Sequence, residues 1–428
     1  MTIATIKSKD NFCYYYYTWM VLIVTSNLGS YLSFGSIPLY RIILFFHLLL
    51  FFSSGDRFIS FKNFLLDNRN FLWLFIWFFC SFISIFYKQN DVAVVNINDS
   101  LKYLYFTFEG LNFIIFSYFY LKKIGSGKIF FVITFLFIIS LFLGIIESIT
   151  SIHLPNSGSL YYQTNTSINQ PTGFLFNTNN YSIYITSYFP IVFYYLNHFN
   201  YFFNKLISVL ITLLTTYVVI VTYSRGGMIT LLFILIYIYI YYLRKYTPFL
   251  LFLISGGLLL AHIINNKTDS NLLINKIVKS FTEKNESTNQ RIDIYKNTLF
   301  IFKSHIIGGV GIGNLEKVLS YMKTGYFSRA INVDLVSKPH NFFLEQMASL
   351  GLMSSSFIIF IFNILVKNIH SLKKFKNKQE LMLLCLLPFL SFFIGCLTMS
   401  SNIDQRFNWI LLGIISYFSN GGRKSIYE

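Results

Sequence analysis

Long apolar stretches, separated by shorter polar segments, run along nearly the whole chain. A helix that crosses the hydrocarbon core of a bilayer needs about 20 mostly apolar residues, within a range of roughly 17–25. Twelve stretches meet or approach this length, so we predict an all-α integral membrane protein with about 12 transmembrane helices in a single polytopic domain, 1–428. The predicted helices are 12–32, 37–53, 71–87, 101–121, 128–149, 181–197, 205–223, 226–243, 247–264, 342–366, 381–400 and 406–420.

The basic residues indicate how these helices are oriented, because Lys and Arg in short loops stay on the cytoplasmic side. With both termini cytoplasmic, eighteen Lys and Arg residues fall in cytoplasmic segments, against four in the short outer loops and the adjoining span ends. The segments 150–180 and 265–340 then both lie on the outer face of the cytoplasmic membrane.

The long outer loop 265–340 is predicted to be partly helical. In Arg291–Phe302, apolar residues recur at helical spacing, which predicts an amphipathic helix along the membrane surface. Gly308–Asn314 follows as a helix breaker, and a second short helix is expected from about Asn314 through Lys323. The glycines do not have the GxGxxG spacing of a dinucleotide site, so a tight turn between two helices is favoured.

Composition narrows the function classes. The chain is 54% hydrophobic and 12% charged, whereas soluble domains carry about 25% charged residues. The net charge of +17 follows the predicted topology, which makes nucleic-acid binding an unfavoured explanation. The four cysteines have no CxxC spacing, and no histidine cluster has ligand spacing, so neither a metal nor another cofactor is expected.

Two arginines are candidates for binding an anion. Arg225 lies in the short loop between two predicted spans, and Arg291 begins the predicted amphipathic helix. A guanidinium group matches a phosphate bidentately, and the glycines after Arg225 would allow a ligand to approach the backbone. The alternatives are an interfacial anchor for Arg225 that contacts lipid phosphate, and a solvated surface residue for Arg291.

Polar residues also gather where the long loop meets the next apolar stretch. Pro339 precedes His340, whose imidazole could act as a general base or could cap the helix. Asn341 could cap this helix or orient a sugar hydroxyl, and Glu345 lies inside the predicted span, where ionisable residues often have a function. The other acids in predicted spans are Glu109 and Glu147, and Glu109 could instead pair with a partner inside the bundle.

Four motifs follow one another within 170–355, and all are predicted to lie on the outer face. They are a segment that begins with glycine and contains three asparagines, a Ser-Arg-Gly turn, an arginine helix followed by a Gly-Val-Gly-x-Gly turn, and a His-Asn pair followed by a glycine. The residues are Gly173–Ser182, Ser224–Gly227, Arg291 with Gly308–Asn314, and His340–Asn341 with Gly351.

Together these motifs resemble those of the O-antigen polymerase and O-antigen ligase superfamily of bacterial envelope glycosyltransferases. The chain departs from the family at Thr178, where proline is usual, and at Ser354, where the ligase version has Gly, Thr or Tyr. The resemblance implies a GT-C-type, metal-independent transferase whose donor is an undecaprenyl-diphosphate-linked glycan. It also implies that Arg225 and Arg291 bind the diphosphate and that His340 activates the acceptor hydroxyl, supported by Asn179, Asn341 and Glu345.

The function expected first is a polymerase that joins lipid-linked repeat units into O-antigen or capsule-like polysaccharide. A ligase that transfers the glycan to lipid A-core is the alternative, and a glycolipid flippase is the alternative from another class. A polymerase would work beside a chain-length regulator and a flippase in the bacterial inner membrane. Transporters often show repeat symmetry and broken helices near the middle of the membrane. The polar residues here gather at one face instead, which favours an enzyme.

Overall fold

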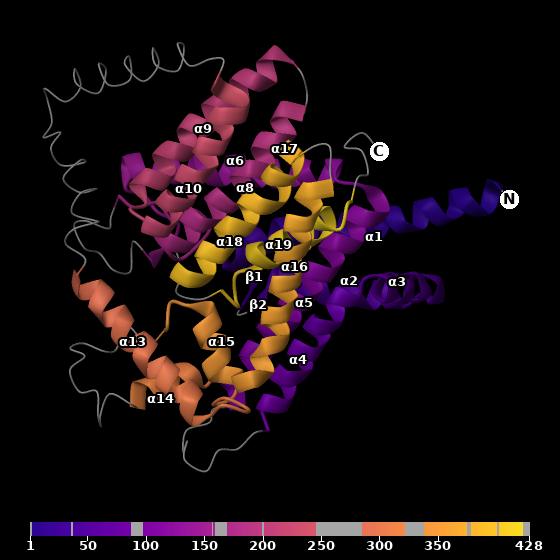
Figure 1. The fold of residues 1–428 in the computed structure, drawn as a ribbon. Coiled ribbons are helices and arrows are strands. Elements are labelled where there is room, and N and C mark those ends of the chain that lie inside the picture. The colour runs from indigo at the N-terminus through magenta and orange to yellow at the C-terminus, as the bar shows by residue number, and fades with distance from the viewer. Residues whose placement is uncertain are drawn as a thin grey trace, which may run out of the picture.

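The computed structural model describes residues 2–35, 37–86, 97–155, 157–158, 169–198, 201–244, 285–321, 338–374, 378–399 and 402–422. This part of the chain is almost entirely helical (Figure 1). The α-helices are α1 Thr2–Leu28, α2 Leu39–Phe52, α3 Gly55–Asp67, α4 Leu72–Ser84, α5 Ile97–Ile124, α6 Gly127–Thr150, α8 Thr178–His198, α9 Phe202–Val221, α10 Arg225–Ile238, α13 Asn285–Ser304, α14 Leu315–Tyr321, α15 Phe342–Leu350, α16 Ser355–Lys374, α17 Lys378–Leu381, α18 Leu387–Thr398 and α19 Arg406–Ser419.

Shorter elements complete the fold. The 3-10 turns are η1 Gly29–Tyr31, η2 Arg69–Phe71 and η7 Gly351–Ser354, and the π-helical turns are η3 Tyr239–Leu243 and η8 Met382–Leu386. The strands β1 Ser33–Phe34 and β2 Ile37–Pro38 form an antiparallel pair in which Ser33 lies opposite Pro38. This pair belongs to the connection between α1 and α2.

The all-α membrane class is confirmed. Among the described residues, six helices are long and apolar enough to cross a bilayer, or seven if α2 and α3, bent by 99°, form one span. Every predicted span contains a helix except 247–264, which lies outside the described residues. The total of twelve spans and the GT-C architecture remain predictions.

Burial explains why some predicted spans fall short of the hydropathy expected for a membrane helix. In α8, every residue from Asn180 to Phe193 is buried, and in α19 so is every residue from Phe407 to Ser419. Helices that meet protein on all sides do not need an apolar outer surface. By contrast, α9 and α10 leave many apolar side chains exposed to the surroundings. The bundle is therefore built around a central group of helices that includes α5, α8 and α19.

The predicted span 342–366 lies within one candidate membrane span, Phe342–Lys373, but the α-helix in it is interrupted by the 3-10 turn η7. Helix α15 ends at Leu350, and Gly351 has φ +60°, a left-handed conformation that favours glycine. A Cβ atom on Gly351 would lie 2.4 Å from the carbonyl oxygen of Ile306. The chain bends here because the outer loop occupies the space that a continuous helix would fill.

The outer loop forms the two expected helices, α13 and α14, with a glycine turn between them. The backbone of this turn is hydrogen-bonded to the end of α15: Val310 N–H donates to the Ala348 carbonyl at 3.0 Å, and Gly311 N–H to the Ser349 carbonyl at 2.9 Å. The Leu352 N–H in turn donates to the Ile306 carbonyl at 2.7 Å. Figure 1 shows α13, α14 and α15 together at one corner of the molecule, away from the end that carries the C-terminus.

Close packing between α5 and α19 yields a stability prediction. A Cβ on Gly413 would lie 2.5 Å from the Ile114 carbonyl oxygen, so Gly413→Ala forces these two helices apart. Overpacking of this kind costs about 1–3 kcal/mol. We expect a lower midpoint of thermal unfolding for the purified protein in detergent. The matched control is Gly55→Ala, where a Cβ meets nothing within 4 Å; equal effects of the two changes would contradict the packing argument.

Candidate functional site

His340 lies in the short turn that leads into α15. Its backbone is in the left-handed region, with φ +48°, and its ring is partly buried. The Nδ1 atom is buried and has no hydrogen-bond partner among the described residues. The helix cap expected at this position is supplied by Asn341 instead, so the imidazole is not used in capping.

The environment keeps the His340 imidazole neutral. Burial, and after it the positive charges of Arg291 and Lys338, together lower its pKa from 6.5 to about 4. A neutral imidazole has one ring nitrogen that can accept a proton, which is the form a general base requires. The electrostatic effect of Arg291 also shows that the structure brings two of the predicted site residues into proximity.

Arg291 lies on α13 and is partly buried. One turn later on the same helix, the Tyr295 hydroxyl donates to the His340 carbonyl at 3.4 Å and is 3.5 Å from the Leu397 carbonyl oxygen. Burial raises the Tyr295 pKa, so the hydroxyl remains protonated and able to donate. Tyr295 thus connects α13 to both the His340 turn and the end of α18. The sequence pattern identifies Tyr295 only as one of the apolar residues at helical spacing in Arg291–Phe302.

Arg225 is the first residue of α10 and is also partly buried. The Ser224 hydroxyl caps this helix by accepting from the Gly227 N–H at 3.4 Å. A Cβ on Gly226 would lie 2.9 Å from the Thr398 hydroxyl, and one on Gly227 would overlap the Ser182 hydroxyl. The two glycines therefore allow the start of α10 to fit between α8 and α18.

These contacts place the four sequence motifs at the same end of the bundle. The start of α10 touches Thr398 on α18, and the neighbouring Leu397 carbonyl lies beside Tyr295 on α13. Arg225 is thereby linked through α18 to the Arg291–His340 pair. Direct convergence of all three side chains remains a prediction.

Asn179 lies at the start of α8, where its N–H donates to the Asn177 side chain at 2.7 Å. The next residue, Asn180, is buried, and its Oδ1 atom has no partner among the residues described. Two residues after Asn180, Ser182 meets the start of α10. The asparagine segment is therefore part of the same end of the bundle, although no contact joins Asn179 to His340 or the arginines among those described.

Asn341 caps α15, which confirms one of its two expected roles. Its side-chain oxygen accepts from the Leu344 N–H at 3.2 Å, and its own carbonyl accepts from the Glu345 N–H at 3.0 Å. A cap of this type fixes the direction in which a helix begins. The cap therefore fixes the backbone next to His340.

Glu345 is buried on α15 and helps to line a small cavity with Tyr103 and Glu316. At its edge, the Lys338 ammonium lies 3.5 Å from a Glu316 carboxylate oxygen, which also accepts from the Tyr103 hydroxyl at 2.7 Å. Burial alone would lower the Lys338 pKa, but the nearby carboxylates raise it overall. Glu345 and Glu316 thus hold a cation that lies two residues before His340.

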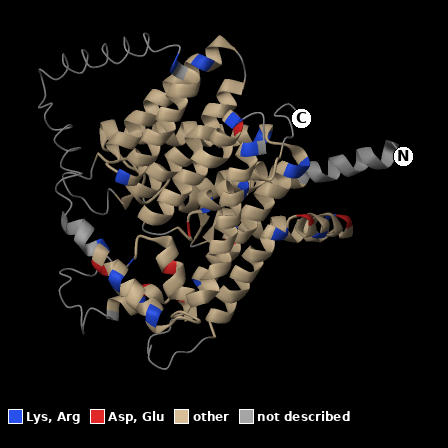
Figure 2. Ribbon diagram, viewed as in Figure 1, with Lys and Arg blue, Asp and Glu red and all other residues tan. Residues whose placement is uncertain are grey.

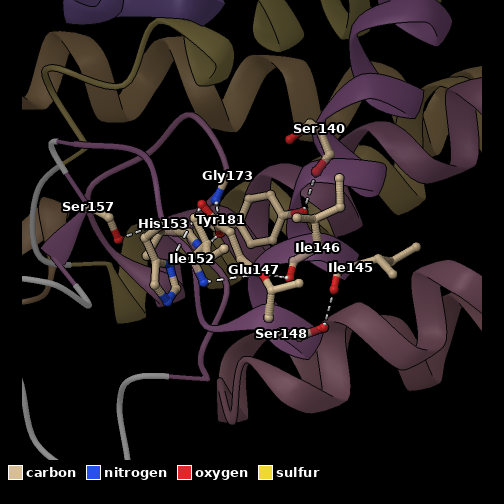
Figure 3. Close-up of polar contacts among 12 residues, drawn as sticks. Ser140, Ile145, Ile146, Glu147, Ser148, Ile152, His153, Ser157, Gly173 and Tyr181 are labelled. Carbon is tan, nitrogen blue, oxygen red and sulfur yellow. Dashed lines mark hydrogen bonds and ion pairs between the residues drawn. The ribbon is translucent and has the colours of Figure 1, made fainter.

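Glu147 has a structural role that its position in a predicted span did not specify. One oxygen of its carboxylate accepts from the N–H groups of Thr172 at 2.7 Å and Gly173 at 2.8 Å, and the His153 ring lies 3.7 Å from the other (Figure 3). Gly173, with φ +53°, is packed against the Tyr181 ring. Glu147 thereby fixes the position of the segment that leads into α8.

Glu109 pairs with Arg41 at 3.1 Å, which confirms the partner expected inside the bundle.

The described part of the chain holds no group of three or more His, Cys, Asp or Glu side chains arranged to bind a metal ion. Its charged residues gather mainly at the ends of the bundle, while the long helices between them are largely uncharged (Figure 2). The His340 end of the bundle carries the guanidinium groups of Arg225 and Arg291 and a neutral imidazole.

Comparison with known proteins identifies one family model and one curated protein that this chain resembles. A family model described as O-antigen ligase matches residues 210–361, an interval that contains Arg225, Arg291, His340, Asn341 and Glu345 but not Asn179. A Bacillus subtilis protein, described as teichuronic acid biosynthesis protein TuaE, is 23% identical over 364 residues, which cover 83% of this chain and 72% of that protein. These matches confirm the resemblance to the O-antigen polymerase and ligase family. The apolar helices of the described residues agree with a multi-pass membrane protein of this kind.

Two substitutions separate the two roles expected for Asn341, which are capping of α15 and contact with a sugar hydroxyl. Asn341→Ala removes the cap and should destabilise α15 by about 1 kcal/mol, whereas Asn341→Ser retains a capping oxygen. If capping is its whole role, Ser restores both the unfolding midpoint and the amount of polysaccharide made in cells. Restored stability without restored polymer would show that the amide itself contacts substrate.

Proposed function

We propose that this protein polymerises undecaprenyl-diphosphate-linked repeat units into O-antigen or capsule-like polysaccharide at the outer face of the cytoplasmic membrane. The observation that carries the proposal is the neutral imidazole of His340, whose backbone carbonyl accepts from Tyr295, one turn after Arg291 on α13. This end of the bundle also holds Arg225. A base next to fixed cations suits a reaction in which a hydroxyl is deprotonated and an anion leaves.

The proposed step is a direct glycosyl transfer. A ring nitrogen of His340 accepts the proton of the acceptor hydroxyl, and the hydroxyl oxygen attacks the anomeric carbon of the donor sugar. The bond from that carbon to the diphosphate oxygen breaks, and the electron pair leaves with undecaprenyl diphosphate. Arg225 and Arg291 bind the diphosphate, whose negative charge grows in the transition state.

The low pKa of His340 fits this arrangement once the donor is considered. Arg291 lowers the pKa while its charge is uncompensated. A bound diphosphate would compensate that charge, so the imidazole becomes more basic when the donor is in place. Donor binding would thus prepare the base for the acceptor, without a metal ion.

Polymerase is preferred to ligase for two reasons. Ser354 departs from the ligase pattern, and the relative from Bacillus subtilis is described by the biosynthesis of teichuronic acid. The second candidate is transfer of the glycan to lipid A-core, because the matching family model carries the description O-antigen ligase. In either case we place the protein in the cytoplasmic membrane with both termini inside, beside a flippase and a chain-length regulator.

The surface glycan of a deletion strain distinguishes these functions. Complementation with the wild-type gene should restore a ladder of long chains, and His340→Ala should leave one repeat unit attached to the acceptor, as resolved by gel electrophoresis. Long polymer that remains on undecaprenyl diphosphate would mean ligase. An unchanged surface glycan in the deletion strain would refute both the polymerase and the ligase function. Normal chains made by the His340→Ala protein would refute the role of His340 as general base.

The effect of Arg291 on His340 predicts a shift in pH dependence. The base must be neutral, so activity of the purified enzyme is lost as pH falls through the His340 pKa, about 4 before the donor binds. Arg291→Gln removes a positive charge, so the pKa rises and the acidic limb of the kcat/KM profile moves to higher pH. Arg291→Lys keeps the charge and should leave the limb in place. The same shift in both variants would show that charge is not the cause.

A further inference from the structure

A cavity of about 760 Å³ opens at the end of the bundle opposite the His340 site. It is formed where η2 and the ends of α5, α16 and α19 meet. Helix α5 shows the separation: Asp99 near its start pairs with Lys317 of α14 at 2.6 Å, while Lys122 near its end lines the cavity. Twenty-three residues of helix span about 35 Å, which is roughly the thickness of a bilayer core.

The cavity carries excess positive charge. Arg69, Lys122 and Lys367 line it, with Asp67 as the one lining acid among the described residues. Asp67 pairs with Lys122 at 3.4 Å, and both side chains are exposed, so this pair is weak. Lys367 donates to the neutral amide oxygen of Asn420 at 2.8 Å, which leaves its charge uncompensated. Three positive charges against one negative leave a net charge of +2 in the lining.

Neutral polar groups form a connected wall of the same cavity. The Tyr118 hydroxyl donates to the Asn68 side chain at 2.8 Å and accepts from the Asn420 side chain at 3.2 Å. Lys367 joins this chain through Asn420. Side chains held in this way present fixed positions around the cations, so a charged group can bind there without first ordering the wall.

The rim indicates where such a group would come from. Leu66 lines the cavity and is 63% exposed, and Phe58 and Ile59 on the same helix, α3, are also more than half exposed. The opposite face of α3 packs onto the bundle through Phe61 and Phe64. An apolar surface next to a basic cavity suits a molecule with acyl chains and an anionic headgroup. Basic pockets between transmembrane helices are known to bind anionic lipid headgroups.

We propose that the cavity between η2, α5, α16 and α19 binds the phosphate-containing headgroup of an anionic membrane lipid. The binding site faces the side of the membrane away from His340 and is independent of the glycosyl-transfer function proposed above. Arg69, Lys122 and Lys367 contact the phosphate, and the Asn and Tyr side chains hold them around it.

Native mass spectrometry of the full-length protein tests the proposal, with phosphatidylglycerol, phosphatidylethanolamine and inorganic phosphate as separate probes. We expect phosphatidylglycerol to bind more tightly than phosphatidylethanolamine. The combined change Arg69→Gln, Lys122→Gln and Lys367→Gln should weaken phosphatidylglycerol binding by about 100-fold. Arg69→Gln alone should weaken it by about fivefold, and because this side chain is exposed, its loss tests the site even if the combined variant folds poorly.

The matched control is Lys62→Gln, Lys205→Gln and Lys378→Gln, which removes the same charge from exposed positions outside the cavity lining. Retained phosphatidylglycerol binding in this control, with loss in the cavity variant, supports the site. Equal loss in both variants, or equal binding of the two lipids by the wild type, overturns it. If inorganic phosphate displaces the lipid from the wild type at comparable concentration, the phosphate site stands and its ligand is a soluble phosphate.

Discussion

The arrangement of the His340 end of the bundle depends on hydrogen bonds between the backbone of the Gly308–Gly313 turn and the end of α15. They run from Val310 and Gly311 to carbonyls of α15, and back from Leu352 to Ile306. A Cβ on Gly309 or Gly351 would lie 2.3–2.4 Å from backbone atoms of the opposing segment, so these glycines permit the approach. Because α13 is joined to this turn, the docked loop brings Arg291 toward His340.

The sequence could predict this end of the molecule in outline. The glycine turn, the helix after Arg291 and the cap at Asn341 all follow from local rules of spacing and side-chain chemistry, and all are present. The break at Gly351 could not be predicted, because its cause is a segment some forty residues earlier in the chain that takes the place of the next helical turn. Local rules likewise could not assign Tyr295, whose partners are carbonyls of two distant segments.

Ionisable residues inside the predicted spans show a second limit of sequence reasoning. The positions of Glu109, Glu147 and Glu345 predicted that these acids matter, but the sequence did not identify the groups that they contact. Glu109 pairs with an arginine, Glu147 binds two backbone N–H groups of a loop, and Glu345 lies near Lys338. A carboxylate in a low-dielectric interior needs donors or cations wherever they are available, and their identity is fixed only by the tertiary fold.

The burial of α8 also bears on how the chain enters the membrane. This helix carries Asn180, Ser182, Thr186 and Ser187 in its buried part, and the hydroxyls of both serines have no partner among the described residues. Such a segment partitions poorly into lipid by itself. It packs against α6 and α9, the helices that precede and follow it among those described. Insertion of α8 is therefore more favourable when these more apolar neighbours enter the membrane with it than when α8 enters alone.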